Sequence, residues 1–339
     1  MKRAGQLFPT YATMEALLAA HQKARMGKRN HRACFEFERN LGANLQTLLQ
    51  ELQNGTYTPK PCNRFWVNEN KKARLIEAPA YRDLVVQHAI YAAVSPIFER
   101  KYIHTNFACR IGKGTHKAAD WLQAAMRKAP RSAWVLHVDV RKFFYSIDRA
   151  VLAGVLARHI KCSQTLALMA MFAQRPESTG VPIGNLLSQT FANVYLNSLD
   201  HFCKRSLKAQ SYARYMDDSV MLAPSRQVGL GWLTAIRKHL ALIGLEISHH
   251  SLSLIKRGVN FVGFRTWARA RFVRPGLISA VRADAKNNRL HALVSRLGHA
   301  IKTASLQPLL NHLKANHAHI FVCLPQSHRR RYNPHPALA

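Results

Sequence analysis

The stretch YARYMDDSVML, Tyr212 to Leu222, places two adjacent carboxylates, Asp217 and Asp218, between apolar flanks. Two neighbouring negative charges repel each other, and they are costly to bury unless a partner neutralises them. Apolar and polar residues alternate around the pair, which predicts two strands that turn at residues 216–218. The turn would present both carboxylates at the edge of a sheet. A polar turn is the simple interpretation of this pattern, and a divalent-metal site is the alternative.

A third acid, Asp139, closes the apolar strand AWVLHVDV at residues 133–140. If this strand pairs with the hairpin, Asp139 converges with Asp217 and Asp218, and three carboxylates offer oxygen ligands that suit Mg²⁺ better than zinc. A two-metal site of this kind activates an attacking hydroxyl and stabilises a departing pyrophosphate in phosphoryl transfer. The simple alternative is a pair of turn residues with Asp139 capping the next helix. Asp148, in SIDRAVL, is predicted to be a helix N-cap.

The composition favours a polyanionic partner. The chain has 339 residues, of which 50 are Lys or Arg and 17 are Asp or Glu, giving a net charge of +33. The basic residues are spread along the whole chain, which favours nucleic acid over a lipid surface. The six cysteines form no CxxC pair, so neither a zinc site nor a disulfide framework is indicated and a reducing cytoplasm is expected. Neither a membrane-spanning run nor a signal peptide is apparent.

The remaining pattern mixes helices and strands, so we expect an α+β fold. Pro96 is expected to interrupt one of the helices. The expected helices cover residues 11–55, 82–102, 143–160, 185–208, 228–243 and 282–319, and the expected strands, besides those above, cover 63–69, 73–79 and 253–266.

Several blocks, in their order along the chain, resemble the reverse transcriptases. They are YMDD (215–218), DVRKFFYSID (139–148) and GVPIGNLLSQTFANVYLNSLD (180–200), with ARLIEAPAYRDLVVQHAI (73–90), ACRIGKGTHKA (108–118) and GVNFVGF (258–264). The resemblance spans roughly residues 60–270. It implies a right-hand polymerase of fingers, palm and thumb, whose antiparallel palm sheet carries the catalytic residues Asp139, Asp217 and Asp218.

The resemblance also implies a domain order and a metal site. We expect a helical N-terminal extension at 1–58, fingers and palm at 59–270, a helical thumb at 271–322 and a basic, flexible tail at 323–339. Two Mg²⁺ ions would be held by Asp139, Val140, Asp217 and Asp218. The protein is expected to be cytoplasmic and encoded by a bacterium or phage.

Further residues are expected to contact the substrate. Lys72 and Arg74, in a basic hairpin, would hold the incoming triphosphate, because charged donors bind phosphate oxygens strongly; a solvated charge run is the alternative. Phe144 lies five positions after Asp139 and would exclude a 2′-hydroxyl sterically. One of Phe143 and Phe144 is expected to be core.

The block 180–200 adds three candidate positions, and the block ACRIGKGTHKA adds a fourth. Gly184 would let the backbone approach the nascent base pair, since it has no side chain. Gln189 is a further substrate-side candidate, and Arg110 would contact template or phosphate. Ile183 replaces an amide able to hydrogen-bond, which would weaken geometric checking of the base pair; an ordinary strand hydrophobe is the alternative.

One departure from the general pattern narrows the resemblance. Most reverse transcriptases have Gln-Gly and then Ser-Pro in this block, whereas this chain has Ile183-Gly184 and then Ser188-Gln189. This form is similar to the reverse transcriptases of diversity-generating retroelements, which copy a template-repeat RNA and misincorporate opposite adenine. The implied partners are that RNA, the RNA/cDNA duplex, dNTPs and a pentameric accessory variability protein.

Two other interpretations of the function stay open. A group II intron-type or retron reverse transcriptase is one, although little chain follows residue 320 for an intron protein's appendages. A catalytically silent RNA-binding protein on a polymerase scaffold is another. The general acid for pyrophosphate release is open among His249, His250 and Lys256, and Gly263 is expected to form the turn of a primer grip.

Overall fold

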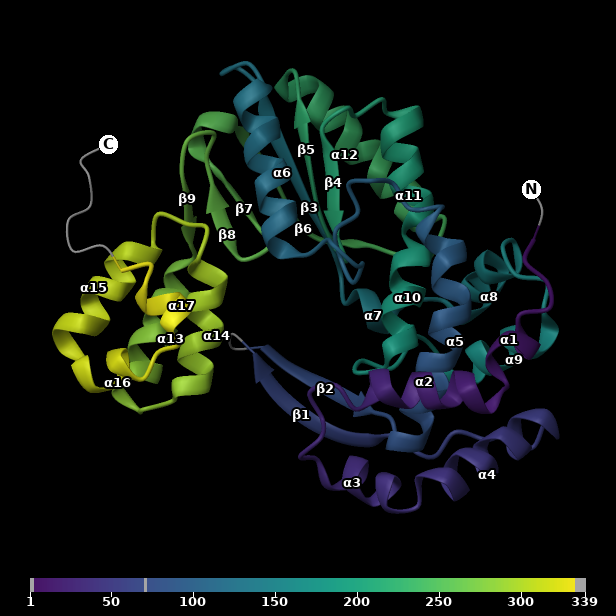
Figure 1. Cartoon of the computed structure of the whole chain (residues 1–339). Helices are drawn as coiled ribbons and strands as arrows, with labels where there is room; N and C mark the ends of the chain where they lie inside the picture. Colours follow the sequence, from purple (N-terminus) through teal and green to yellow (C-terminus); the bar gives the residue numbers. More distant parts are fainter. Residues whose placement is uncertain (1–2, 70–71, 333–339) are drawn as a thin grey trace. The chain divides into compact units, whose positions relative to one another are not determined.

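The computed structural model describes residues 3–69 and 72–332, and the chain groups into two compact units. Unit 1 comprises Met1–His104, Val140–Ser206 and Ala235–Ser248. Unit 2 comprises Thr105–Asp139, Leu207–Thr234 and His249–Ala339. Helices and antiparallel strand pairs are mixed along the chain (Figure 1), which confirms the predicted α+β class.

In the described part of the chain, four helices open unit 1; the last three lie within residues 11–55, where helices are predicted, and the first ends at the start of that range. Their apolar residues recur every three or four positions, so that one face packs inward. In α4 this face consists of Leu45, Leu48 and Leu52, which are all buried. Thr13 caps α2 by accepting a hydrogen bond from the amide of Ala16 at 3.2 Å. The helices are α1 (Phe8–Tyr11), α2 (Met14–Ala24), α3 (Arg32–Arg39) and α4 (Leu41–Gln53).

Helix α5 (Tyr81–Glu99) runs through Pro96, so the predicted interruption is wrong. A proline removes one backbone donor and crowds the carbonyl four residues earlier. Pro96 stands in the last turn of α5, where the loss of one hydrogen bond affects little of the helix. Val85, Val86 and Ile90 are fully buried and hold the preceding turns in place.

The rest of unit 1 is a hairpin and a set of short helices. The predicted strand pair is confirmed, because β1 (Asn63–Glu69) and β2 (Lys72–Ala78) pair antiparallel. The predicted cap is also confirmed: the Asp148 carboxylate accepts hydrogen bonds from the amides of Ala150 and Val151 at 2.7 and 3.0 Å. The helices are α7 (Phe143–Ser146), α8 (Arg149–Ala157), α9 (Ser163–Ala173), α10 (Leu186–Tyr195), α11 (Asn197–His201) and a π-helix (Phe202–Ser206).

The prediction of one helix over residues 185–208 is therefore wrong. Helix α10 ends at Tyr195 because Leu196 has a ψ of 1°, outside the α-helical range. The chain then resumes as α11 and continues as a π-helix. Apolar periodicity continues across such a break, so it does not reveal the break from sequence alone.

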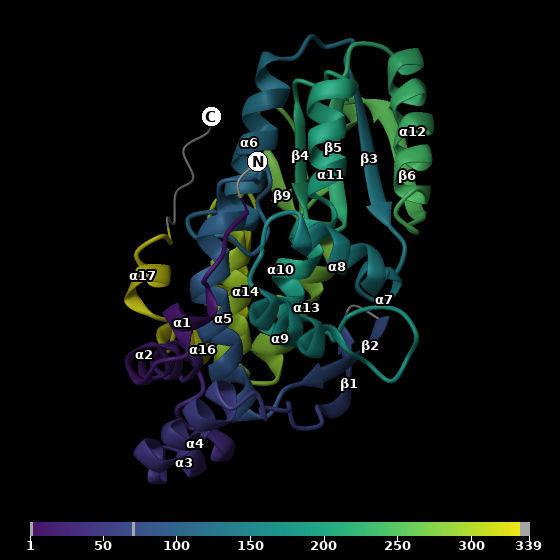
Figure 2. The ribbon, with the colours of Figure 1, turned by 90° about the vertical axis from the view of Figure 1, so that its right-hand side faces the viewer.

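A four-stranded sheet with the strand order β4-β5-β3-β6 lies mainly in unit 2. Strand β5 pairs antiparallel with both β3 and β4. Figures 1 and 2 show helix α6 lying against these strands. The elements are α6 (Thr115–Lys128), β3 (Trp134–Val140), β4 (Tyr212–Tyr215), β5 (Asp218–Ala223), α12 (Arg226–Ala241) and β6 (Ile247–Leu254).

The prediction of one strand over residues 253–266 is wrong, because this segment contains the end of one strand, a 3₁₀-helix and the start of a second sheet. Strand β6 ends at Leu254, a 3₁₀-helix covers Ile255–Arg257, and a three-stranded sheet follows. Gly258, with a φ of +72°, ends the 3₁₀-helix, and the chain turns at Gly263, with a φ of +88°, where a turn is predicted. The strands are β7 (Val259–Phe261), β8 (Phe264–Thr266) and β9 (Arg271–Val273).

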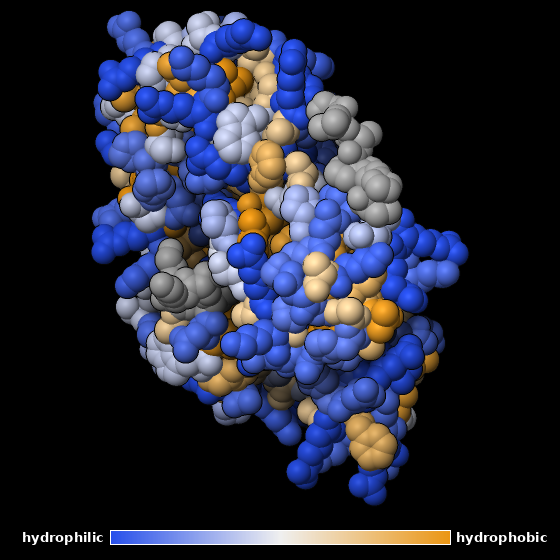
Figure 3. Space-filling model, turned by 90° about the vertical axis from the view of Figure 1, so that its left-hand side faces the viewer, coloured by the Kyte–Doolittle hydropathy of each residue, from blue (hydrophilic) through white to orange (hydrophobic). Residues whose placement is uncertain are grey.

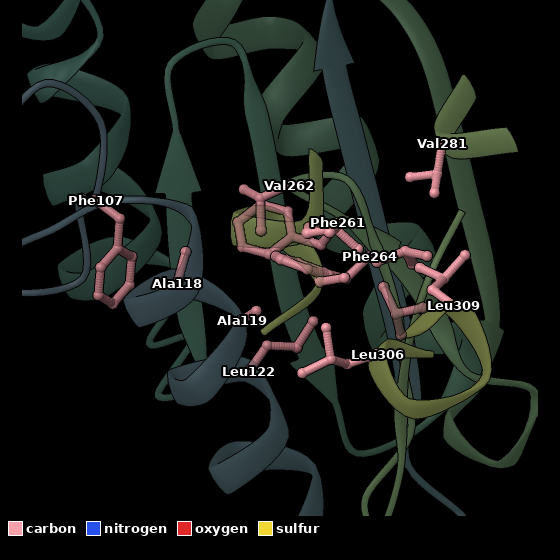
Figure 4. Close-up of a cluster of buried hydrophobic side chains, with 14 of the residues drawn as sticks. Phe107, Ala118, Ala119, Leu122, Phe261, Val262, Phe264, Val281, Leu306 and Leu309 are labelled. Carbon is pink, nitrogen blue, oxygen red and sulfur yellow. The ribbon is translucent and has the colours of Figure 1, made fainter. Parts of the chain in front are cut away.

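Helices complete unit 2 and share one core with α6 and the second sheet. Figure 4 shows this core, with side chains from α6, from the β7–β8 hairpin and from the C-terminal helices gathered together. The helices are α13 (Pro275–Lys286), α14 (Leu290–Ala300), α15 (Leu306–Asn316), α16 (Ala318–Val322) and α17 (Gln326–Arg329). Within the segment predicted as a tail, Leu324 and His328 are buried. The division into extension, fingers and palm, thumb and tail stays a prediction.

The surface is largely polar. On the face drawn in Figure 3, hydrophilic side chains predominate and apolar ones form smaller patches between them. Among the described residues, no helix combines the length and the hydropathy that crossing a membrane demands.

Candidate active site

The acidic pair lies at the tight turn of the β4–β5 hairpin. Tyr215 and Asp218 are cross-strand partners, so only Met216 and Asp217 form the turn. Met216 has a φ of +53°, in the left-handed region that two-residue hairpin turns use. A side chain there is uncommon and costs about 1–3 kcal/mol. The predicted turn at residues 216–218 is confirmed, and it holds the two acids on a strained, well-defined backbone.

A buried arginine holds this turn by a hydrogen bond to its backbone. The side chain of Arg214 is fully buried, and its Nη1 donates a hydrogen bond to the carbonyl of Met216 at 2.9 Å. The backbone of Arg214 also pairs with a neighbouring segment, through Thr105 at 3.0 Å and Phe107 at 2.9 Å. The sequence analysis missed this role because YARYMDD offers no sign that its arginine points inward.

The third acid lies opposite the pair. In the β3–β5 register Asp139 is the cross-strand partner of Asp218, so their Cα atoms are about 4.5–5.5 Å apart and their side chains share a face of the sheet. All three acids are half-buried. The predicted strand pairing is therefore confirmed, and it brings Asp139 to the end of the sheet that carries Asp217 and Asp218. Val140 follows as the last residue of β3.

A histidine that the sequence analysis missed contacts one of these acids. The Nε2 atom of His137 lies 2.5 Å from Oδ1 of Asp218. The ring of His249 lies edge-on to that of His137, with a centroid distance of 6.3 Å. Strand alternation was the available signal, since His137 lies two residues before Asp139 and therefore faces the same side.

The donor set suits a hard cation, but its side chains are not arranged as ligands. Three carboxylates at one sheet end supply the oxygen atoms that Mg²⁺ prefers. Among the described residues, however, no three His, Cys, Asp or Glu side chains form a group that could hold a metal ion. One of the three carboxylates, that of Asp218, is hydrogen-bonded to His137 instead.

Several substrate-side candidates meet in unit 1, around strand β2. The amide of Glu77 in β2 donates a hydrogen bond to the carbonyl of Ile183 at 2.7 Å. Gly184 has a φ of +112°, and a Cβ there would lie 3.0 Å from Cγ2 of Ile76. The backbone conformation therefore favours glycine, and an added Cβ would also make a tight contact with Ile76. Arg74 stands in the same strand.

The two phenylalanines of FFYS have different environments. Phe143 is buried and Phe144 is half-buried, with ring centroids 5.7 Å apart. This agrees with the expectation that one of the two is core. The hydroxyl of Tyr145 donates a hydrogen bond to the carbonyl of Leu75 at 3.3 Å, which ties this segment to β2 as well.

The remaining candidates are Gln189, Arg110 and Lys72. Gln189 is exposed on α10 in unit 1. Arg110 is half-buried in unit 2, where its Nη1 donates to the carbonyl of Asn106 at 2.8 Å, and Asn106 bridges to Arg214 of β4. Lys72 begins β2, but its side chain lies outside the described part of the chain.

A buried ion-pair network that the sequence analysis missed fixes the position of β2. The carboxylate of Glu77 is almost fully buried between Arg175, at 2.8 Å, and Arg64, at 2.6 Å. Two cations around one buried carboxylate offset its cost of desolvation. An acid inside the apolar strand ARLIEAP was the available signal.

A comparison with family models identifies the family of this chain. A family model described as reverse transcriptase (RNA-dependent DNA polymerase) matches residues 59–266. Protein YkfC of Escherichia coli strain K12 is 27% identical over 207 residues, which is 57% of this chain and 54% of YkfC. Group II intron-encoded protein LtrA of Lactococcus lactis subsp. cremoris is 27% identical over 169 residues, 47% of this chain and 28% of LtrA. The matched part of the chain thus covers about half the length of YkfC and about a quarter of the length of LtrA.

A solved structure shares the fold. Telomerase from Candida albicans, in complex with a fragment of telomeric RNA, matches with a TM-score of 0.50 at 13% identity. The match covers 82% of this chain and 56% of the telomerase chain. Together with the family match, this likeness confirms the predicted right-hand polymerase fold.

Proposed function

This chain belongs to the reverse transcriptase family, and we propose that it is an RNA-directed DNA polymerase that extends a primer along an RNA template. The observation that carries the proposal is the register that sets Asp139 opposite Asp218, beside the turn with Asp217. The chain has only 17 acids and a net charge of +33, so three carboxylates at one end of a sheet indicate a specific site and not acids that serve solubility.

The three acids, with the carbonyl of Val140, would hold two Mg²⁺ ions. Divalent cations bound in this way neutralise phosphate charge and lower the pKa of the attacking hydroxyl. His137 would release Asp218 when the ions bind, and Arg214 would keep the turn in place throughout.

Residues of unit 1 would bind the nucleotide. Lys72 and Arg74 would contact the triphosphate, and Phe144 would lie against the sugar and reject a 2′-hydroxyl. Gly184 would let the backbone approach the new base pair, with Gln189 nearby in sequence. Arg110 would contact template or phosphate. The hydrogen bonds from Glu77 to Ile183 and from Tyr145 to Leu75 support a common location for the unit 1 candidates.

Primer extension on an RNA template tests the proposal. Asp139→Asn, Asp217→Asn and Asp218→Asn should each lower Mg²⁺-dependent extension by about a thousandfold, because several kcal/mol of charge stabilisation are lost. Asp148→Asn is the matched control, since asparagine caps a helix as well as aspartate does. Wild-type protein that binds RNA without extending a primer would instead support the silent RNA-binding alternative.

At a finer level, we propose an error-prone enzyme of a diversity-generating retroelement, which copies a template-repeat RNA with a pentameric accessory protein. The support is the Ile183-Gly184 and Ser188-Gln189 form of the block. The half-buried side chain of Ile183 offers no hydrogen bond to a base pair. Group II intron-type and retron enzymes remain the alternative, and the resemblance to LtrA favours the first of these.

The error spectrum of the cDNA separates these possibilities. We expect misincorporation to concentrate opposite template adenines, and Ile183→Gln to lower it about fivefold by restoring one hydrogen bond. Ile183→Met, which stays apolar, should leave the spectrum unchanged. Errors spread evenly over the four template bases would reject the retroelement assignment and leave the polymerase proposal intact.

A further inference from the structure

An open groove of about 610 Å³ lies at the other end of the palm sheet from the acids. Its walls come from the C-terminal half of α6, the loop before β4, the end of β5 and the first turns of α12, all in unit 2. Ala223 lines the groove at one end of β5, and Asp218 stands at the other end. Five strand residues span about 17 Å, so the groove is separate from the acidic site.

Two tryptophans and two lysines dominate the lining. Trp121 and Trp232 are half-buried, so each indole is packed on one side and accessible on another. The ring of Trp121 is fixed by that of Phe107, at a centroid distance of 6.3 Å. Lys128 and Lys208 are exposed beside them. We call this set of four residues, with Gln210 and Ser211, the tryptophan groove.

The charge around the groove has one sign. Among the described residues that line it there is no carboxylate. The wall segments 124–133 and 224–232 add Arg127, Arg131 and Arg226 and contain no acid. Such a surface attracts polyanions. The volume lies within the usual range of about 300–1,000 Å³ for binding sites.

Flat aromatic surfaces beside ammonium groups match the chemistry of unpaired nucleotides. A single strand offers base faces that stack on indoles and phosphates that approach lysines. A duplex offers its phosphates but keeps its bases stacked inside. We propose that the tryptophan groove binds an unpaired stretch of RNA, with bases on Trp121 and Trp232 and phosphates near Lys128 and Lys208. This role is separate from polymerisation at the acids.

A site-resolved binding assay tests the proposal with the full chain. A fluorescent oligouridylate of about 12 nucleotides is compared with an abasic oligomer of the same length and charge, at one salt concentration at which the wild-type protein binds both measurably. The double substitution Trp121→Leu and Trp232→Leu should weaken oligouridylate binding about tenfold and leave abasic binding unchanged, since only stacking is removed. Photo-crosslinking with 4-thiouridine RNA should label peptides that contain Trp121 or Trp232.

Controls keep the outcome decisive. Phe35→Leu removes an exposed aromatic ring from α3 and should change neither affinity. The double substitution Lys128→Gln and Lys208→Gln changes exposed residues only, so it tests the proposal even if the double tryptophan variant fails to fold. It should weaken the binding of both oligomers. Equal affinities of wild type and variants for oligouridylate, or crosslinks elsewhere only, would overturn the proposal. Extension of a short primed template by the wild-type protein is measured separately. If the wild-type protein binds RNA at the tryptophan groove but does not extend the primer, the polymerase proposal is rejected and the groove proposal stands.

Discussion

Asp218 shows that one acid of the site has two competing roles. Its Oδ1 atom lies 2.5 Å from His137, while the proposed chemistry requires the same carboxylate to turn toward a cation. A hydrogen bond to a charged group contributes about 1.5–3 kcal/mol, so this contact opposes metal binding measurably. We therefore expect His137 to compete with a cation for the carboxylate of Asp218.

We expect His137→Leu to tighten Mn²⁺ binding about tenfold, because the cation no longer competes with the imidazole. Isothermal titration calorimetry of the free protein measures this without relying on activity. His249→Leu is the matched control, since it removes a ring that lies edge-on to His137 and leaves the imidazole of His137 at the carboxylate. Weaker Mn²⁺ binding by the His137 variant would show instead that His137 orients Asp218 for the metal.

At the scale of elements, the β7–β8 hairpin is fixed to a C-terminal helix through a glycine turn. A Cβ on Gly263 would lie 2.7 Å from Nε2 of His299, which belongs to α14. The His299 ring cannot easily move away, because it stacks on Phe264 at a centroid distance of 4.2 Å and an angle of 9°. Burial, with His116 nearby, lowers the pKa of His299.

We therefore expect Gly263→Ala to destabilise the protein by about 1–3 kcal/mol, through both its φ of +88° and the clash. Urea unfolding followed by circular dichroism measures the change. Gly298→Ala, in α14 with nothing near the added methyl, should stabilise the helix by about 0.5–1 kcal/mol. An unchanged unfolding midpoint for Gly263→Ala would mean that the hairpin and helix are not coupled as described.

At the scale of the whole molecule, buried histidines and excess positive charge act together. Burial, with Lys28 and Lys23 nearby, lowers the pKa of His88 to about 4. Burial also lowers the pKa of other histidines in both units, namely His21, His159, His239, His299, His312 and His328. Their neutral forms are thus favoured by folding.

We expect stability to fall as the pH drops from about 6.5 to 4. In this range the unfolded chain binds protons that the folded chain excludes at these histidines, so the folded state loses free energy relative to the unfolded state. Each protonation also adds to a net charge that is already +33. Thermal unfolding between pH 7.5 and 4.5 tests this, and His88→Gln should flatten the decline. A constant melting temperature across that range would contradict it.

The sequence was sufficient for features that depend on neighbouring residues or on a repeated pattern. The YMDD hairpin, the strand that carries Asp139 and the cap at Asp148 were predicted correctly, since alternation and capping are local properties. The breaks at Leu196 and within residues 253–266 were missed. They depend on backbone angles that apolar periodicity does not encode. The interruption predicted at Pro96 was wrong, because the buried apolar residues of the helix outweigh the loss of one backbone hydrogen bond at the proline.

Tertiary structure alone decided how distant side chains meet. The residue types and the net charge of +33 already indicated phosphoryl-transfer chemistry and a nucleic-acid partner. Only the β3–β5 register, however, sets Asp139 opposite Asp218 and brings His137 within reach of it. The burial of the Arg214 side chain and the placement of Trp121 and Trp232 on the walls of one groove are likewise products of packing. Contacts between residues far apart in the chain depend on how whole elements bury their apolar faces, and no local pattern records that.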